Sequence, residues 1–279
     1  MTATASRTAT SSYDLGRRTA SGLALALVVF GSLVSVPTFT LVLLLVTLGS
    51  LYELAGLSAR KGGALVFPVA AVAVAVDITL AAFGLQHVYE KPLLAGTILA
   101  SLGFSLGGER QGYFARSAFT VFGVLYLGWL GSYFLALRNL PQVGAGYTAA
   151  CIIAIALTDI FAMLVGSVAG RTRLSSISPN KTWEGAVGGF AATVTACAAA
   201  FGPVFGLPWW HGALVGAITS IAAQAGDLVE SALKRDARVK DAGTFLGGHG
   251  GILDRYDSYL FGGIAFYFAL YVSGHIAHP

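Results

Sequence analysis

Long apolar segments separated by short polar ones follow one another along nearly the whole of this 279-residue chain. A helix needs about 20 predominantly apolar residues to cross the hydrocarbon core of a bilayer. The sequence therefore predicts an all-α fold: a polytopic integral membrane helical bundle with about nine transmembrane helices. We place these helices near residues 21–36, 38–57, 64–84, 93–107, 117–137, 146–169, 185–204, 209–233 and 258–275.

Composition supports the membrane class and a simple domain organisation. Charged residues make up 11% of the chain, against about 25% in soluble domains. Residues 1–20 are rich in Ser, Thr and Ala, which predicts a disordered cytoplasmic N-terminus, and we expect residues 21–279 to form a single membrane-embedded domain. A second apolar segment follows the first almost at once, so we expect an uncleaved first helix rather than a signal peptide. Cys151 and Cys197 lie in apolar segments without a partner at metal-ligand spacing, which argues against a disulfide or a zinc site.

The distribution of Lys and Arg predicts how the chain is oriented in the membrane. With the N-terminus in the cytoplasm, 15 of the 17 Lys and Arg residues face the cytoplasm, and only Lys91 and Arg138 lie outside. This division agrees with the positive-inside rule. It predicts a multi-pass protein of a cytoplasmic membrane, of bacterial type, whose net charge of +4 reflects topology and not a nucleic-acid partner.

One stretch, residues 226–257, concentrates the charges. Asp227, Glu230, Ser231 and Lys234 have i, i+3, i+4 and i+7 spacing, so a helix presents them on one face. Asp254 and Asp257 are three residues apart, and a helix that begins near Ile252 would point both in the same direction.

Between these two groups, residues 243–251 contain five glycines around His249. Such a loop lets backbone N–H groups approach an anion, and a helix that starts after it adds its positive end. Carboxylates beside cations and a glycine loop suggest Mg²⁺ that holds a nucleotide triphosphate. The alternative interpretation is a solvated cytoplasmic loop with ordinary mixed charges.

Two segments of this region resemble a known family. Residues 231–257 read SALKRDARVKDAGTFLGGHGGILDRYD, which resembles the signature of the phosphatidate cytidylyltransferases (CDP-diacylglycerol synthases) at every specified position. Residues 178–185, SPNKTWEG, resemble a second motif of the family, which has a lysine where this chain has Asn180. That departure removes one phosphate contact. The resemblance covers the C-terminal half of the chain, and the N-terminal half only as a hydrophobic pattern.

The resemblance implies that CTP and phosphatidate are the substrates, and CDP-diacylglycerol and pyrophosphate the products. Because the phosphate of phosphatidate is already anionic, positioning and charge neutralisation would dominate catalysis. We expect Mg²⁺ at Asp227, Asp254 and Asp257, as a two-metal site or a mixed divalent and monovalent one. The expected catalytic residues are Asp227, Lys234, Arg235, Lys240, Asp241, His249, Asp254, Arg255 and Asp257.

The cations of this set, Lys234, Arg235, Lys240 and Arg255, are candidates for binding the triphosphate and the departing pyrophosphate. We expect Ser178, Lys181 and Thr182 to bind a substrate phosphate, and Asp241 and Glu184 to orient cations. His249 either protonates the leaving group or supports the glycine loop through a hydrogen bond.

The lipid substrate must reach the site from within the bilayer. Arg171 and Arg173 follow the sixth apolar segment, where they either line the mouth of a lipid cleft or only determine topology. Asp159 lies below the cytoplasmic surface and is expected to face a polar cavity, as a substrate-binding residue or as the partner of a basic one. Asp77 is deeper and has no predicted role. The small residues Ala162, Gly166, Gly170, Gly185, Gly188 and Gly189 predict close helix packing.

Three other interpretations remain open. The chain could use CTP on another lipid, such as an isoprenoid alcohol or an ether lipid. A cation-coupled transporter would have inverted repeats and sites near the bilayer midplane, and the sequence has neither. A structural membrane subunit would not need the charged stretch. The lipid bilayer is the expected environment, and a homodimer is compatible with the sequence, which leaves the oligomeric state open.

Overall fold

The computed structural model describes residue 22 and residues 24–108, 111–243 and 250–276, and all regular elements in these ranges are helices. This confirms the predicted all-α class. In chain order they are a helical segment at residues 24–32, then α2 (Val36–Ala59), α3 (Phe67–Ala82), α4 (Gln86–Ser105), α5 (Tyr113–Gly123), the π-helix η1 (Val124–Trp129), α6 (Leu130–Arg138), α7 (Gly144–Ala169), α8 (Trp183–Phe205), α9 (Trp209–Asp236) and α10 (Leu253–Val272).

Five helical segments of the described chain are long and apolar enough to cross a membrane. They are α2, the continuous run of α5, η1 and α6 (Tyr113–Arg138), α7, α8 and α9. The apolar helix α3 is shorter. Each of the nine segments predicted from the sequence overlaps a helical part of the described chain, so the sequence locates these helices although not all of their boundaries. That all nine cross the membrane remains a prediction.

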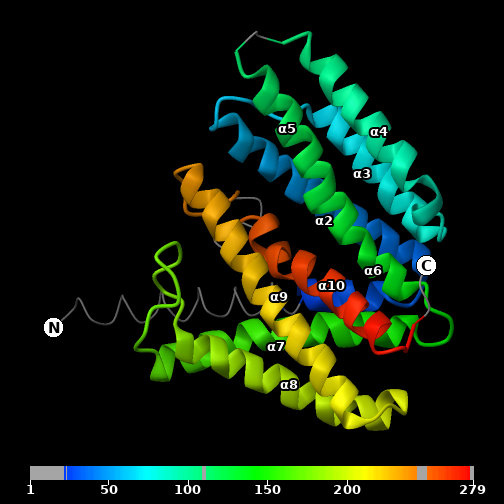
Figure 1. Cartoon of the computed structure of the whole chain (residues 1–279), viewed down its shortest axis with the longest axis vertical. Helices are drawn as coiled ribbons and strands as arrows, with labels where there is room; N and C mark the ends of the chain where they lie inside the picture. The colour runs from blue at the N-terminus through cyan, green and yellow to red at the C-terminus, as the bar shows by residue number, and fades with distance from the viewer. Residues whose placement is uncertain (1–21, 23, 109–110, 244–249, 277–279) are drawn as a thin grey trace, which may run out of the picture.

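The helices form two groups that α10 joins (Figure 1). In one group, α8 packs against both α7 and α9. In the other, α2 and α4 pack on α3, and the continuous run from α5 to α6 completes the group. Helix α10 packs along α9 and also contacts α7, α2 and α6. Residues on α10 therefore face side chains from both halves of the sequence.

Glycines allow α7 and α8 to approach closely. A Cβ atom added at Gly185 would lie 2.5 Å from the carbonyl oxygen of Ala162, and one at Gly189 would lie 2.5 Å from that of Thr158. Both distances are too short for any side chain. The small residues that the sequence placed on these two segments therefore lie at a helix–helix contact, as predicted.

Local sequence signals explain most helix boundaries. The Ser35 hydroxyl accepts a hydrogen bond from the Thr38 N–H (3.2 Å) at the start of α2, which has a proline in its first turn. Helix α10 begins at Leu253, next to the predicted start at Ile252. Helix α4 begins at Gln86, ahead of the predicted start at residue 93. The prediction was wrong there because the first turns of α4 are polar and Pro92 lies inside the helix.

Candidate active site

The charged residues converge on a cavity of about 1430 Å³. Of the residues predicted to bind substrate, metal or phosphate, nine line this cavity: Asp159, Ser178, Lys181, Thr182, Asp227, Lys234, Asp254, Arg255 and Asp257. They come from α7, α9, α10 and the segment between α7 and α8. The structure thus brings together residues that lie up to about a hundred positions apart in the chain.

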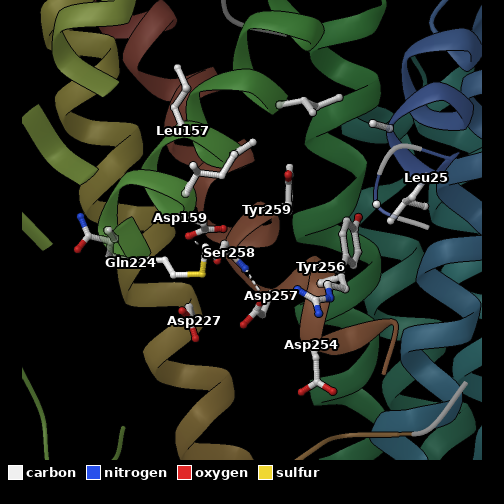
Figure 2. Close-up of a pocket in the computed structure, with 18 of the residues that line it drawn as sticks. Leu25, Leu157, Asp159, Gln224, Asp227, Asp254, Tyr256, Asp257, Ser258 and Tyr259 are labelled. Carbon is white, nitrogen blue, oxygen red and sulfur yellow. Dashed lines mark hydrogen bonds between the residues drawn. The ribbon is translucent and has the colours of Figure 1, made fainter. Parts of the chain in front are cut away.

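Three aspartates from three helices surround one part of the cavity. Asp159 of α7, Asp227 of α9 and Asp257 of α10 lie around it, and Asp254 lies farther along (Figure 2). Backbone and hydroxyl donors hold two of them. The Ser258 N–H donates to Asp257 Oδ1 (2.8 Å), and the Ser258 hydroxyl donates to Asp159 Oδ1 (3.5 Å).

Two lysines balance part of this negative charge. The Lys181 ammonium forms an ion pair with Asp227. The Lys234 ammonium lies between two carboxylates: it forms an ion pair with Glu230, one helical turn earlier, and contacts Asp254 Oδ1 at 2.5 Å. Residues 227–234 all lie on α9, which confirms the predicted helix, and Asp227 and Lys234 of this set line the cavity.

Backbone N–H groups further fix Asp254. The Gly251 N–H donates to Asp254 Oδ2 (2.6 Å), and the Ala242 N–H donates to the same oxygen (3.1 Å). Asp254 lies in the first turn of α10, ahead of the predicted membrane segment. Burial alone would raise the pKa of Asp254, but the hydrogen bonds from Lys234 and Gly251 outweigh it and hold that pKa below its ordinary value.

The segment before α8 forms a folded loop beside the cavity. Arg173 and Thr182 form an antiparallel bridge, and the Leu174 N–H donates to the carbonyl oxygen of Lys181 (2.8 Å). The Thr182 hydroxyl then caps α8 by accepting from the Gly185 N–H (3.1 Å). The loop therefore holds Lys181 and Thr182, both predicted to bind a phosphate, at the cavity wall.

Glu184 has different partners from those that we expected. Its carboxylate accepts hydrogen bonds from the backbone N–H groups of Arg171 and Thr172, both at 3.1 Å to Oε2. In the described chain Glu184 therefore joins the first residues of the loop, 171 and 172, to the first turn of α8. The sequence analysis had expected it to orient a cation.

The remaining predicted residues do not line the cavity. Arg171, Arg173, Arg235, Lys240 and Asp241 are outside its wall, and the Arg235 guanidinium donates to the carbonyl oxygen of Val239 (3.2 Å). His249 lies outside the described residues. The structure therefore brings together four of the predicted aspartates with Lys181, Lys234 and Arg255. The roles of all the predicted site residues remain predictions.

Sequence reasoning gave no role at the site to several residues that the structure places in or beside it. Asn180, at the position where the second motif departs from the family pattern, lines the cavity. So does Gln224, three residues before Asp227 on α9, and that i, i+3 spacing could have identified it. Glu53 of α2 contacts the start of α10 across about two hundred residues of sequence, and no local pattern signals such a contact.

Apolar side chains form the other wall of the cavity. They come from the helical segment at residues 24–32, from α2 and from α7, and include Leu25, Val29, Phe39, Leu43, Val46, Ile152, Ile153 and Leu157. Within the described ranges, no group of three or more His, Cys, Asp or Glu side chains is arranged to hold a metal ion. The Mg²⁺ site therefore remains a prediction.

Comparison with known proteins agrees with the family resemblance of the two motifs. The profile of the Cytidylyltransferase family matches residues 16–273. The phosphatidate cytidylyltransferase of Bacillus subtilis (strain 168) is 43% identical over 150 residues, which are 53% of this chain and 56% of that protein. That of Staphylococcus haemolyticus (strain JCSC1435) is 38% identical over 178 residues, 63% of this chain and 67% of the relative.

A plant relative matches over a similar region. The chloroplastic phosphatidate cytidylyltransferase 4 of Arabidopsis thaliana is 36% identical over 183 residues, 55% of this chain and 46% of the relative. The chain thus spans between about half and two thirds of the length of these three relatives.

Proposed function

This chain belongs to the cytidylyltransferase family, and on that basis we propose that it transfers the cytidylyl group of CTP to phosphatidate. The products are CDP-diacylglycerol and pyrophosphate. The relatives named phosphatidate cytidylyltransferase support this choice of substrates.

The observation that carries the proposal is the two-sided wall of the cavity. One side is apolar and belongs to residues 24–32, α2 and α7. The other holds Asp159, Asp227 and Asp257 with the ammonium groups of Lys181 and Lys234. A ligand with acyl chains at one end and a phosphate at the other matches both sides, because buried apolar groups need apolar walls and charged groups need partners.

The reaction requires positioning more than proton transfer. An oxygen of the phosphatidate phosphate attacks the α-phosphorus of CTP, a new P–O bond forms, and the bond between the α- and β-phosphates breaks to release pyrophosphate. The attacking oxygen carries no proton that a base must remove. The chain's own contribution is to bring two anionic substrates together, and Lys181, Lys234 and Arg255 are the cations at the cavity wall for that task.

The donor set fits Mg²⁺ by its chemistry. Asp227, Asp254 and Asp257 offer carboxylate oxygens, the ligands that Mg²⁺ prefers. Asp227 and Asp254 are each paired with a lysine ammonium, which marks two places where these carboxylates accept a positive charge. If the carboxylates held Mg²⁺, Lys181 and Lys234 would be released to bind phosphate. When bound, the ion supplies charge neutralisation to the triphosphate and the leaving pyrophosphate.

The proposal includes the arrangement in the membrane. All nine helical segments would cross a bacterial cell membrane, with the N-terminus and the charged end of the cavity on the cytoplasmic side. The division of Lys and Arg along the sequence supports this orientation, and CTP is a cytoplasmic nucleotide. A homodimer remains a prediction, which the mass of the purified protein in detergent would test.

The direct test is an assay of the purified protein. We expect incubation in detergent with phosphatidate, labelled CTP and Mg²⁺ to give a labelled CDP-lipid and pyrophosphate in equal amounts. Parallel reactions with an ether-linked phosphatidate and with an isoprenoid alcohol separate the related lipid specificities. Label transfer to the isoprenoid alcohol and none to phosphatidate would overturn the proposed substrate.

A further inference from the structure

Helix α10 starts without a cap of its own. The first N–H groups of any helix have no partner within that helix, and a local Ser, Thr, Asp or Asn usually supplies one. The residue before α10 is Ile252, which makes no side-chain capping bond. A distant residue supplies the acceptor instead: the carboxylate of Glu53 on α2 accepts from the Ile252 N–H (3.0 Å) and the Leu253 N–H (2.8 Å).

Three successive backbone N–H groups therefore bind two carboxylates. The Gly251 N–H donates to Asp254, and the next two donate to Glu53. Asp254 belongs to the candidate active site, whereas Glu53 comes from the other half of the sequence. The same turn of backbone thus connects a site carboxylate to α2.

The carboxylate of Glu53 is closely enclosed. Glu53 is 6% exposed, and a Cβ atom at Gly243 or Gly251 would overlap its carboxyl group. Among the described residues, no Lys or Arg forms an ion pair with Glu53. Its negative charge lies instead at the positive end of the α10 dipole, where an anion is favoured.

From this geometry we propose that Glu53 is a positioning residue for the reaction. It fixes the first turn of α10 against α2, and so sets the direction in which Asp254 and Asp257 project into the cavity. The effect on turnover rests on the proposed function of these aspartates. The capping contact itself does not, because it can be measured without any substrate.

The test compares hydrogen exchange in Glu53→Ala and Glu53→Gln with that of the unaltered protein. Residues 250–256 should exchange faster in Glu53→Ala, because two N–H groups lose their acceptor. The exchange rate in Glu53→Gln should lie between those of Glu53→Ala and the unaltered protein. The amide oxygen can accept from one of the two N–H groups, whereas the amide NH₂ is itself a donor and cannot accept from the other. Ser50→Ala is the matched control: Ser50 is buried one turn earlier on α2, and its hydroxyl donates to the carbonyl oxygen of Val46 (2.9 Å) within the same helix.

Kinetics give a second, separate measurement. We expect kcat of Glu53→Gln to fall about tenfold to a hundredfold, the typical effect of losing an orienting group, and the KM for phosphatidate to stay near its original value because the apolar wall is intact. Ser50→Ala should match the unaltered protein in both assays.

Unchanged exchange at residues 250–256 in folded Glu53→Ala would overturn the inference. So would faster exchange spread equally through α7 and α8, which would make Glu53 a general structural residue. If the unaltered protein formed no CDP-lipid while exchange at residues 250–256 still rose in the variants, the capping contact would stand and the proposed function would fail.

Discussion

At the scale of single residues, one ammonium group holds much of the site together. Lys234 is mostly buried between Glu230 of its own helix and Asp254 of α10. Breaking a buried ion pair by removing one partner costs about 3–5 kcal/mol, because the other charge is left uncompensated. Here a single lysine faces two carboxylates, so the loss of either one still leaves a paired cation.

This arrangement predicts that Asp254→Asn keeps the fold and loses function. Lys234 retains Glu230, so the protein should insert and unfold at nearly its original temperature. Asp227→Asn should behave alike, because Lys181 is partly exposed and can be hydrated. We expect CDP-lipid formation at least tenfold to a hundredfold slower in either variant across a range of Mg²⁺ concentrations.

The matched control is Asp236→Asn at the end of α9, an exposed carboxylate that pairs with Lys61 outside the cavity. Asp236→Asn should leave turnover unchanged, because this residue is outside the cavity and exposed ion pairs contribute little to stability. Near-normal rates at saturating Mg²⁺ in both Asp227→Asn and Asp254→Asn would contradict the assignment of these aspartates.

Asp77 is the buried carboxylate for which the sequence predicted no role. Its Oδ1 atom lies 3.5 Å from Gln86 Nε2, and its Oδ2 atom has no hydrogen-bond partner in the described structure. An ionised carboxylate in such a place within a membrane is unfavourable. Asp77→Asn, which keeps the shape and removes the charge, should therefore raise or preserve the unfolding temperature and leave activity unchanged. A marked loss of stability on thermal unfolding in detergent would show that the charge has a partner.

At the scale of helices, sequence patterns predicted the elements but not their distant contacts. The helical spacing of residues 227–234 and the start of α10 were confirmed, because both depend on neighbours in the chain. The contact of Glu53 with α10 could not be predicted, since a single carboxylate in an apolar helix does not indicate which N–H groups it will meet. The π-helix at Val124–Trp129 was also missed, because its residues are as apolar as those of an ordinary helix.

The close contact of α7 and α8 gives a prediction of its own. Gly189→Ala places a methyl group 2.5 Å from the Thr158 carbonyl oxygen, so the helices must separate. Overpacking of this kind costs about 1–3 kcal/mol, and the unfolding temperature should fall. Gly103→Ala on α4 is the control, because a Cβ there meets nothing within 4 Å. Equal unfolding temperatures for the two variants would contradict the close packing.

At the scale of the whole molecule, the distribution of charge predicts an orientation in the membrane but does not predict the shape of the cavity. The positions of Lys and Arg suffice to predict which ends of the helices face the cytoplasm. They do not predict that residues 24–32 and α2 line the same cavity as the C-terminal aspartates, because that depends on how α10 packs between two groups of helices. The sequence motifs therefore located the charged wall, whereas the expected lipid cleft could not be assigned to particular apolar residues.

Orientation can be tested by labelling single cysteines from outside intact cells. We expect an impermeant thiol reagent to label a cysteine at position 91 and to leave positions 61, 181 and 240 unlabelled until the cells are opened. The native Cys151 and Cys197 are buried and should add little background. Labelling of position 181 or 240 in intact cells would reverse the proposed topology.

The contact between Glu53 and α10 also has a consequence for biosynthesis. Ribosomes add about 5–20 residues per second, so Glu53 is made roughly 10–40 seconds before residues 252 and 253. During that interval the carboxylate that later caps α10 has no N–H groups to accept, and the aspartates of α10 do not exist. A chain truncated before α10 would therefore contain the apolar wall of the cavity and a Glu53 carboxylate without the two N–H groups that it accepts from. The site can therefore form only after α10 has been synthesised, because Glu53 has no N–H groups to cap before then.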